Sequence, residues 1–266
     1  MKMNQELIKE AGKRIIVPLD FSTLEEVEHT MTKIYDHVSI VKIGLEVIYS
    51  IGARQLLQYF ANRWPNTQIF VDAKLKDISN TLRQTVKTIV SYDNVAMINV
   101  YADSGIESVK AVVEMVKLIN PKIVVLGLTI LTSIPKEEAE RIYRRPFKKQ
   151  IFYFAQSIYT AGCDGLICAA EDLHYFDEYP VEGYGRKIGM AIKSLVKVTP
   201  GIRPAWSATD DQKRIATPEQ AIIDGSDYLV IGRPITRPPS EIGTVANAFS
   251  LVSKEIARGL EARAKL

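Results

Sequence analysis

Three charged residues, Asp72, Lys74 and Asp77, form the pattern D-x-K-x-x-D directly after a short apolar run at 68–71. The run contains β-branched and aromatic residues and predicts a buried strand. Side chains alternate along a strand, so we expect Asp72 and Lys74 on the same face. Because burying a charge is costly unless it is paired, these two side chains should form an ion pair. A lysine ammonium held in this way can stabilise a carbanion and deliver a proton to it.

The same pattern has a purely structural interpretation, which is a salt bridge at the end of a strand. Ion-pair networks perturb charged groups without any catalytic role. The motif alone does not decide between the two interpretations, so the elements that position the other charged residues have to be considered.

Segments typical of strands and of helices alternate along the chain, and each strand-like segment is a short apolar run. Eight such units in about 250 residues fit a (β/α)8 barrel, the TIM-barrel fold. No linker and no change in composition divides the chain, so we expect a single domain over 1–266. An open doubly wound sheet is the structural alternative, but no G-x-G-x-x-G follows the first strand. The eight strands are expected within 14–20, 39–44, 68–71, 95–101, 122–131, 165–170, 195–202 and 228–233.

Helical periodicity and end signals indicate the helices between these strands. Thr23 and Thr217 are predicted to cap two of them. The segment 45–62 is predicted as one helix, and 135–161 as two helices that are separated at Pro146. The other helical segments are expected at 80–91, at 104–119 and from about residue 240 onward.

Polar residues occur at the point where several of these strands end. Active sites of (β/α)8 barrels lie at the carboxyl ends of the strands. A single aspartate or lysine at such a position is more often part of a surface ion pair, but that explanation accounts poorly for several residues on one rim. The residues expected on this rim are Asp20, Lys42, Asp72, Lys74, Thr129, Thr132, Arg203 and Arg233.

Two segments have the composition of a phosphate site: 199–203 (TPGIR) and 231–236 (IGRPIT). The loops after strands seven and eight of a barrel frequently bind phosphate. Gly232 lets the backbone approach a ligand closely, and the Arg233 guanidinium matches two phosphate oxygens. Either segment alone can instead be a glycine turn beside a surface arginine without any phosphate. That alternative is weaker for both segments together.

Composition and charge exclude several classes of protein. The chain has 266 residues, of which 47% are hydrophobic and 24% charged, and this is ordinary for a soluble globular protein. No apolar run approaches the ~18 residues of a membrane span, and the N-terminus has no apolar signal-peptide region, so we expect a cytoplasmic protein without a membrane partner. Cys163 and Cys168 do not indicate a disulfide framework. The net charge of +3 is mild and suits an anionic substrate.

Several common functions lack their motifs. There is no H-E-x-x-H, no C-x-x-C and no G-K-[ST], and no evident metal cage, so neither a metal nor a cofactor is expected. His29, His37 and His174 lie away from the predicted strand ends. The basic run at 144–149 can contact nucleic acid, but no nucleic-acid motif accompanies it. We favour a solvated loop there and expect no nucleic-acid partner.

From residue 14 to about residue 236 the chain resembles the orotidine 5′-monophosphate decarboxylase family. The family signature D-x-K-x-x-D-I-x-N-T is present as DAKLKDISNT. The segments VPLD, VKIG, TILTS, TPGIR, DDQKRIATPEQA and IGRPIT follow the family's order around it. Each of these motifs is weak alone, but seven in order on eight predicted units are specific. The DDQKRIATPEQA segment is most similar to the bacterial group.

The resemblance implies a reaction and the residues that perform it. The reaction is loss of CO2 from orotidine 5′-monophosphate to give uridine 5′-monophosphate without a cofactor, the last step of de novo pyrimidine nucleotide synthesis. A lysine-stabilised carbanion is implied, with Lys74 as its proton donor. The implied charged network consists of Lys42, Asp72, Lys74 and Asp77.

The resemblance also implies substrate contacts and an assembly. Asp20 and Lys42 would bind ribose hydroxyls, and Thr132 would face the pyrimidine edge. A homodimer with shared active sites is implied, in which Asp77 enters the partner's site together with Ile78 and Thr81. The residues implied near the phosphate are Arg203, Gln212, Gly232 and Arg233.

The chain departs from the family pattern at a few positions. Ser79 replaces the usual proline, and Lys76 stands where histidine is common. Neither is a substrate ligand by resemblance, so the implied function is little affected. The segments 135–150 and 179–193 align poorly, and we expect no function from them.

Two rival functions share part of this pattern. The magnesium-dependent 3-keto-L-gulonate 6-phosphate decarboxylases and hexulose-phosphate synthases also have D-x-K-x-x-D. They carry an acid in place of the lysine on strand two and small residues after the motif, so Lys42 and the segment 78–81 argue against them. A barrel that only binds nucleotides is the second rival, but binding alone does not require four alternating charges.

Overall fold

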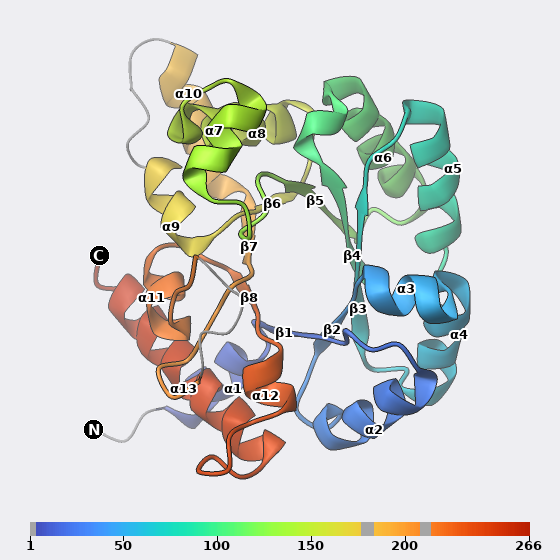
Figure 1. Ribbon diagram of the computed structural model, residues 1–266, viewed down its shortest axis with the longest axis vertical. Coiled ribbons are helices and arrows are strands. Elements are labelled where there is room, and N and C mark those ends of the chain that lie inside the picture. The colour runs from blue at the N-terminus through green and yellow to red at the C-terminus, as the bar shows by residue number, and fades with distance from the viewer. Residues whose placement is uncertain (1–3, 177–183, 208–213) are drawn as a thin grey trace.

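Eight parallel strands close into a barrel, and each pairs with its neighbours in chain order until β8 pairs with β1 (Figure 1). The computed structural model describes residues 4–176, 184–207 and 214–266. The predicted (β/α)8 TIM-barrel fold is therefore confirmed. The strands are β1 (Ile15–Pro18), β2 (Ile40–Ile43), β3 (Gln68–Leu75), β4 (Val95–Tyr101), β5 (Val124–Leu128), β6 (Gly165–Ile167), β7 (Val196–Thr199) and β8 (Tyr228–Val230).

Helices surround the strands on the outside of the barrel (Figure 1). In the described part of the chain, no helix is both long enough and apolar enough to pass through a bilayer. One helix, α1 (Gln5–Gly12), precedes the first strand and packs against the last helix. The helices that follow are α2 (Leu24–Ile34), α3 (Leu45–Ile51), α4 (Ala53–Arg63), α5 (Ser79–Ile89), η1 (Ala102–Ser104), α6 (Ile106–Ile119), α7 (Lys136–Tyr143), α8 (Phe147–Thr160), α9 (Ala170–Leu173), η2 (His174–Phe176), α10 (Tyr184–Ser194), α11 (Pro218–Ile223), α12 (Arg233–Thr236) and α13 (Val245–Arg263).

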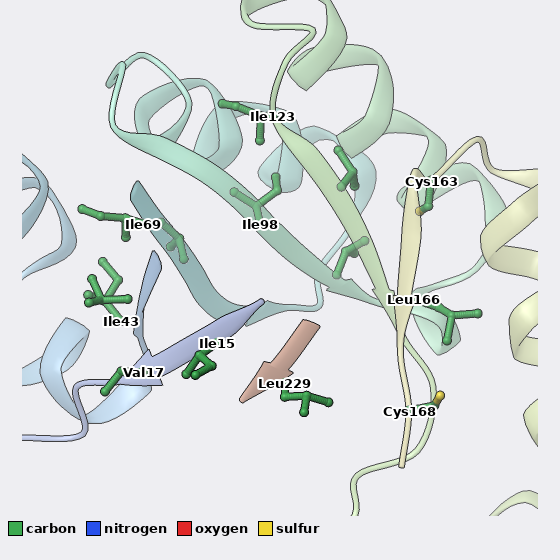
Figure 2. Close-up of a cluster of buried hydrophobic side chains, with 14 of the residues drawn as sticks. Ile15, Val17, Ile43, Ile69, Ile98, Ile123, Cys163, Leu166, Cys168 and Leu229 are labelled. Atoms are coloured by element: carbon green, nitrogen blue, oxygen red, sulfur yellow. The ribbon is translucent and has the colours of Figure 1, made fainter. Parts of the chain in front are cut away.

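Two apolar layers result from the alternation of side chains along the strands. Ile16 and Phe70 belong to a small buried cluster to which seven of the strands contribute, and this cluster fills the barrel interior. Ile15, Ile69 and Leu229 belong to the larger cluster between strands and helices, which Figure 2 shows in close-up. Because both faces of each strand are covered, polar side chains at the carboxyl ends of the strands are exposed mainly at the mouth of the barrel.

Several predicted helix boundaries are confirmed, and one helix was predicted wrongly. The Thr23 hydroxyl accepts a hydrogen bond from the Glu26 N–H at 3.3 Å, and Thr217 caps α11 in the same way. The chain also breaks at Pro146 as predicted, between α7 and α8. The segment 45–62 is not one helix, because Gly52 adopts a φ of 101° that ends α3 before α4 begins.

Candidate active site

Two adjoining cavities open at the carboxyl ends of the strands. One of about 430 Å³ is lined by residues after β1, β7 and β8, and the other of about 180 Å³ is lined mainly by β3, β5 and β6. Lys42, Pro200 and Val230 line both cavities, so the two form one cleft. A cavity of about 740 Å³ beside α2 is larger, but its described lining includes none of the residues predicted for the site. The cleft therefore brings together the predicted residues Asp20, Lys42, Asp72, Lys74, Thr132, Arg203, Gly232 and Arg233.

Four side chains of alternating charge form a chain of ion pairs in this cleft. The Nζ of Lys42 lies 3.1 Å from Oδ1 of Asp20 and 3.2 Å from Oδ2 of Asp72. The Nζ of Lys74 lies 2.8 Å from both carboxylate oxygens of Asp72. The Asp72 side chain is only 9% exposed, whereas Asp20 is 54% exposed. The predicted ion pair between Asp72 and Lys74 is thus part of a longer network that extends from the rim into the barrel.

The electrostatics of this network keep Lys42 positively charged. Burial disfavours the ammonium form, but the carboxylates of Asp72 and Asp20 outweigh burial and raise the pKa of Lys42 above its ordinary value. Asp72 therefore lies between two lysines and holds both of their amino groups at the cleft.

The strand that carries Asp72 and Lys74 is irregular at these residues. Val71 pairs with Ile98 and Leu75 pairs with Val100, so β3 advances by four residues while β4 advances by two. Lys74 has a φ of 48°, in the left-handed region that non-glycine residues rarely adopt. Such a conformation costs about 1–2 kcal/mol. Asp72 and Lys74 line the same cavity, as the prediction of one shared face requires. They do so because β3 has a bulge there, and not because side chains alternate regularly along the strand.

A buried amide on the neighbouring strand occupies this bulge. The main-chain N–H of Lys74 donates to Oδ1 of Asn99 at 2.8 Å, and Nδ2 of Asn99 donates to Oδ1 of Asp72 at 2.6 Å. Asn99 is fully buried on the same face of β4 as Met97. Sequence reasoning did not single it out. The available signal was one amide within the otherwise apolar segment 95–100.

Three predicted residues lie outside the cleft of their own chain. Asp77, Ile78 and Thr81 are exposed where α5 begins, and they are not among the described residues that line the two cavities. Oδ1 of Asp77 accepts a hydrogen bond from the Ile78 N–H at 2.7 Å. The fold of one chain thus does not bring Asp77 to Lys74, and its role in a partner's site stays a prediction.

The other end of the cleft carries the residues predicted for phosphate. Gly232 and Arg233 follow β8 at the start of α12, and Arg203 follows β7. Arg203 is buried; its Nη1 donates to the Ile202 carbonyl at 3.0 Å and its main-chain N–H to the Ala216 carbonyl at 2.9 Å. These contacts hold Arg203 at the wall of the cleft. Gln212 lies outside the described residues.

The smaller cavity combines one charged wall with apolar walls. Lys74 and Thr132 line it together with Phe70, Leu128 and Ile167 from three strands. Such a slot suits a flat ring that carries polar groups on one edge. In the part of the chain that the structure describes, no cluster of three or more histidine, cysteine, aspartate or glutamate side chains is arranged to hold a metal ion.

A second buried ion pair lies at the start of α9. Arg214 pairs with Asp172, which is fully buried at the start of α9. The Nε of Arg214 also lies 2.5 Å from Oε1 of Glu171. Burial raises the pKa of Asp172 to about 6, although the Arg214 guanidinium opposes this shift. The pair fixes Arg214 against the Phe147 ring, whose centroid is 5.0 Å from the guanidinium carbon.

Comparison with known proteins identifies close relatives of the chain. A protein of Hahella chejuensis (strain KCTC 2396) named "Orotidine 5'-phosphate decarboxylase" is 34% identical over 92% of this chain and 97% of that protein. A protein of the same name from Pseudomonas paraeruginosa (strain DSM 24068 / PA7) is 37% identical over 91% and 97%. The crystal structure of orotidine 5′-phosphate decarboxylase from Lactobacillus acidophilus matches with a TM-score of 0.71 at 26% identity, covering 92% of this chain and 99% of that one.

One family model matches residues 13–248 and is described as "Orotidine 5'-phosphate decarboxylase / HUMPS family". The matched range contains all eight strands of the barrel and the complete cleft. Because both the family model and relatives above one-third identity cover most of the sequence, the chain belongs to the orotidine 5′-phosphate decarboxylase / HUMPS family.

Proposed function

We propose that this protein converts orotidine 5′-monophosphate into uridine 5′-monophosphate and CO2. The observation that carries the proposal is the chain of alternating charges, Asp20, Lys42, Asp72 and Lys74, in a cleft whose other end is lined by arginines that include Arg203 and Arg233. The relatives with 34% and 37% identity have the name of this activity. We propose that the whole chain, 1–266, forms one decarboxylase domain.

The proposed chemistry depends on Lys74. When the bond between the pyrimidine ring and the carboxylate breaks, CO2 leaves and the electron pair stays on the ring carbon, where no ring position delocalises it. The Lys74 ammonium stabilises this charge and transfers its proton to the carbon, which leaves a neutral amine that takes a new proton from water. Lys74 lines the cavity that suits the ring, which supports this role.

Asp72 has two proposed roles. Its carboxylate lies within 3.2 Å of Nζ of both Lys42 and Lys74 and thereby orients the proton donor. It also places a negative charge beside the carboxylate of the substrate, and loss of CO2 relieves that repulsion.

Binding is proposed to use the rest of the cleft. Asp20 and Lys42 contact ribose hydroxyls, and Thr132 contacts the edge of the pyrimidine. Remote binding of the phosphate helps to orient the ring and contributes to turnover as well as affinity. The proposed phosphate ligands and neighbours are Arg203, Gln212, Gly232 and Arg233.

We propose that two chains form a homodimer in which Asp77, Ile78 and Thr81 complete the partner's site. Ile78 is 69% exposed, and Tyr49 on α3 is 84% exposed. The two residues follow neighbouring strands, β3 and β2, at the mouth of the barrel. Exposed large apolar side chains in the segments that follow two paired strands favour a protein interface.

The test is turnover of orotidine 5′-monophosphate by the purified protein, followed by the change in ultraviolet absorbance and by release of CO2. We expect turnover that EDTA does not reduce. Two parallel reactions contain a hexulose 6-phosphate or 3-keto-L-gulonate 6-phosphate with Mg²⁺. Turnover of a sugar phosphate alone would favour the magnesium-dependent rivals, and binding of uridine 5′-monophosphate without any turnover would favour a nucleotide-binding protein.

A further inference from the structure

We propose that Asn99 is a positioning residue for the decarboxylation, because its amide fixes both the backbone of Lys74 and the carboxylate of Asp72. This inference rests on the proposed function. The predicted charged network did not include Asn99, which lies on β4 beneath the network and is fully buried.

The first half of the argument concerns the backbone of Lys74. In a regular ladder, a main-chain N–H of β3 would donate to a carbonyl of β4. At the bulge the Lys74 N–H donates to Oδ1 of Asn99 at 2.8 Å instead, while Lys74 has a φ of 48°. A strained backbone persists only where its surroundings hold it. The Asn99 side chain is the group that contacts this N–H, so it stabilises the conformation that directs Lys74 into the cleft.

The second half concerns the carboxylate of Asp72. Oδ1 accepts from Nδ2 of Asn99 at 2.6 Å and from Nζ of Lys74 at 2.8 Å, and Oδ2 faces Nζ of both Lys74 and Lys42. With donors on both oxygens, the carboxylate has one orientation. That orientation places the two ammonium groups on its cleft side.

Only a side chain that donates and accepts at once can make both contacts. The Lys74 N–H requires an acceptor, and this fixes the orientation of the Asn99 amide with Nδ2 toward Asp72. Aspartate at this position would keep the acceptor, lose the donor and add a like charge beside Asp72. Alanine would remove both contacts and leave a buried N–H without its partner.

The experiment compares Asn99→Ala and Asn99→Asp with Asn94→Ala. Asn94 is a matched control because it is also a buried asparagine and it precedes the same strand, but its Nδ2 donates to the Leu57 carbonyl far from the network. We expect both Asn99 variants to lower kcat about 100-fold, the effect of displacing a reacting group by about 1 Å. Their affinity for uridine 5′-monophosphate should stay close to that of the wild type. Asn94→Ala should keep the wild-type kcat.

A crystal structure of Asn99→Ala gives a readout that does not depend on activity. We expect the Lys74 Nζ to leave hydrogen-bond distance of Asp72. If Lys74 keeps its position in the variant, or if kcat and nucleotide affinity fall together in the Asn99 variants, Asn99 is merely structural and the inference is wrong. If the variant does not crystallise, Asn99→Asp serves for the same measurement. Failure of the wild type to turn over orotidine 5′-monophosphate would overturn the proposed function, and the Lys74 geometry would still decide the role of Asn99.

Discussion

The two ends of the cleft are built in different ways. At the strand end, Lys42 on β2 and Lys74 on β3 both form ion pairs with Asp72 on β3. At the loop end, Arg203 and Arg233 extend from the segments that follow β7 and β8. The strand end is therefore held by contacts among its own charged side chains, whereas the loop end carries guanidinium groups on segments outside the sheet.

We expect the strand end of the cleft to position the reacting groups and the loop end to bind the substrate. Groups that act on a developing charge are most effective when their orientation is already fixed, because no reorganisation is needed during the reaction. Guanidinium groups bind an anion through charge-assisted hydrogen bonds, which are roughly twice as strong as hydrogen bonds between neutral groups. Changes at the strand end should therefore reduce kcat, and changes at the loop end should weaken binding and also slow turnover, because phosphate binding helps to orient the ring.

The largest effect is expected for Lys74→Ala. Removal of the proposed proton donor should lower kcat by about 10⁴-fold while the fold and the affinity for uridine 5′-monophosphate are retained. Steady-state kinetics and nucleotide titration measure the two quantities. Lys76→Ala is the matched control, since Lys76 pairs with Asp103 outside the cleft. Substantial turnover by a folded Lys74→Ala protein would refute the assignment.

Mixing two inactive variants tests whether the strand end is shared between chains. Lys74→Ala and Asp77→Ala should each be nearly inactive. After subunit exchange, half of the dimers are mixed, and one of the two sites in each mixed dimer is intact. Activity should therefore return to about a quarter of the wild-type value. If the mass of the mixed dimers shows that subunits have exchanged and the mixture stays inactive, Asp77 acts within its own chain.

Arg233→Ala tests the loop end. Loss of a charge-assisted contact to phosphate should cost about 1.5–3 kcal/mol, or roughly a 10- to 150-fold decrease in kcat/KM. The same substitution should have little effect on orotidine without its phosphate. Arg258→Ala serves as the control, because Arg258 pairs with Glu219 on the outer helices. Equal losses for both substrates would show that Arg233 is not a phosphate ligand.

Two glycines allow a methyl group to be added at each end. A Cβ at Gly44 would lie 2.8 Å from Nζ of Lys42, and a Cβ at Gly232 would lie 2.9 Å from Cγ of Pro18. Gly44→Ala should lower kcat about tenfold with little change in melting temperature, because the flexible Lys42 side chain moves aside. Gly232→Ala should raise KM and destabilise the fold by about 1–3 kcal/mol, because the proline ring cannot move aside. If Gly44→Ala raised KM and Gly232→Ala lowered kcat instead, the proposed roles of the two ends of the cleft would be wrong.

The smallest effect on turnover is expected for Asp172→Asn, which tests the buried ion pair between Asp172 and Arg214. The pKa of Asp172 is about 6 in the folded protein against 3.8 as its ordinary value, so the folded state binds the proton more tightly. Relative to Asp172→Asn, the wild type should lose on the order of 3 kcal/mol of stability as pH rises from about 3 to about 7. Denaturant unfolding at several pH values measures this difference. If the difference in free energy of unfolding between the two proteins does not change with pH, Asp172 has the same pKa in the folded and unfolded states.

The sequence was sufficient for the barrel and for most of the cleft. Eight apolar runs at regular spacing predict eight strands, and the carboxyl-end rule then brings Asp20, Lys42, Asp72 and Lys74 to one rim. Pattern rules assume regular elements, so they predicted one helix over 45–62, and Gly52 interrupts it.

The details of the network could not be predicted in the same way. Nothing about a lysine indicates a left-handed backbone, so the bulge at Lys74 was not expected and Asn99 was overlooked. The position of Asp77 relative to a partner depends on a second chain, which residue spacing within one chain does not specify. These contacts join residues that are distant in sequence or lie in different molecules.

The pairing of β8 with β1 has a consequence for how the protein unfolds. Two hydrogen bonds of this seam, from the Leu229 N–H to the Arg14 carbonyl and from the Ile231 N–H to the Ile16 carbonyl, join segments more than 200 residues apart. Contacts of such long range form late and carry a large loop-closure entropy. Asp20 follows one strand of the seam and Gly232 follows the other, so a nucleotide that binds both ends of the cleft would bridge it. Ligand occupancy would then slow the opening of the ring, and it would protect the first and last strands together from hydrogen exchange.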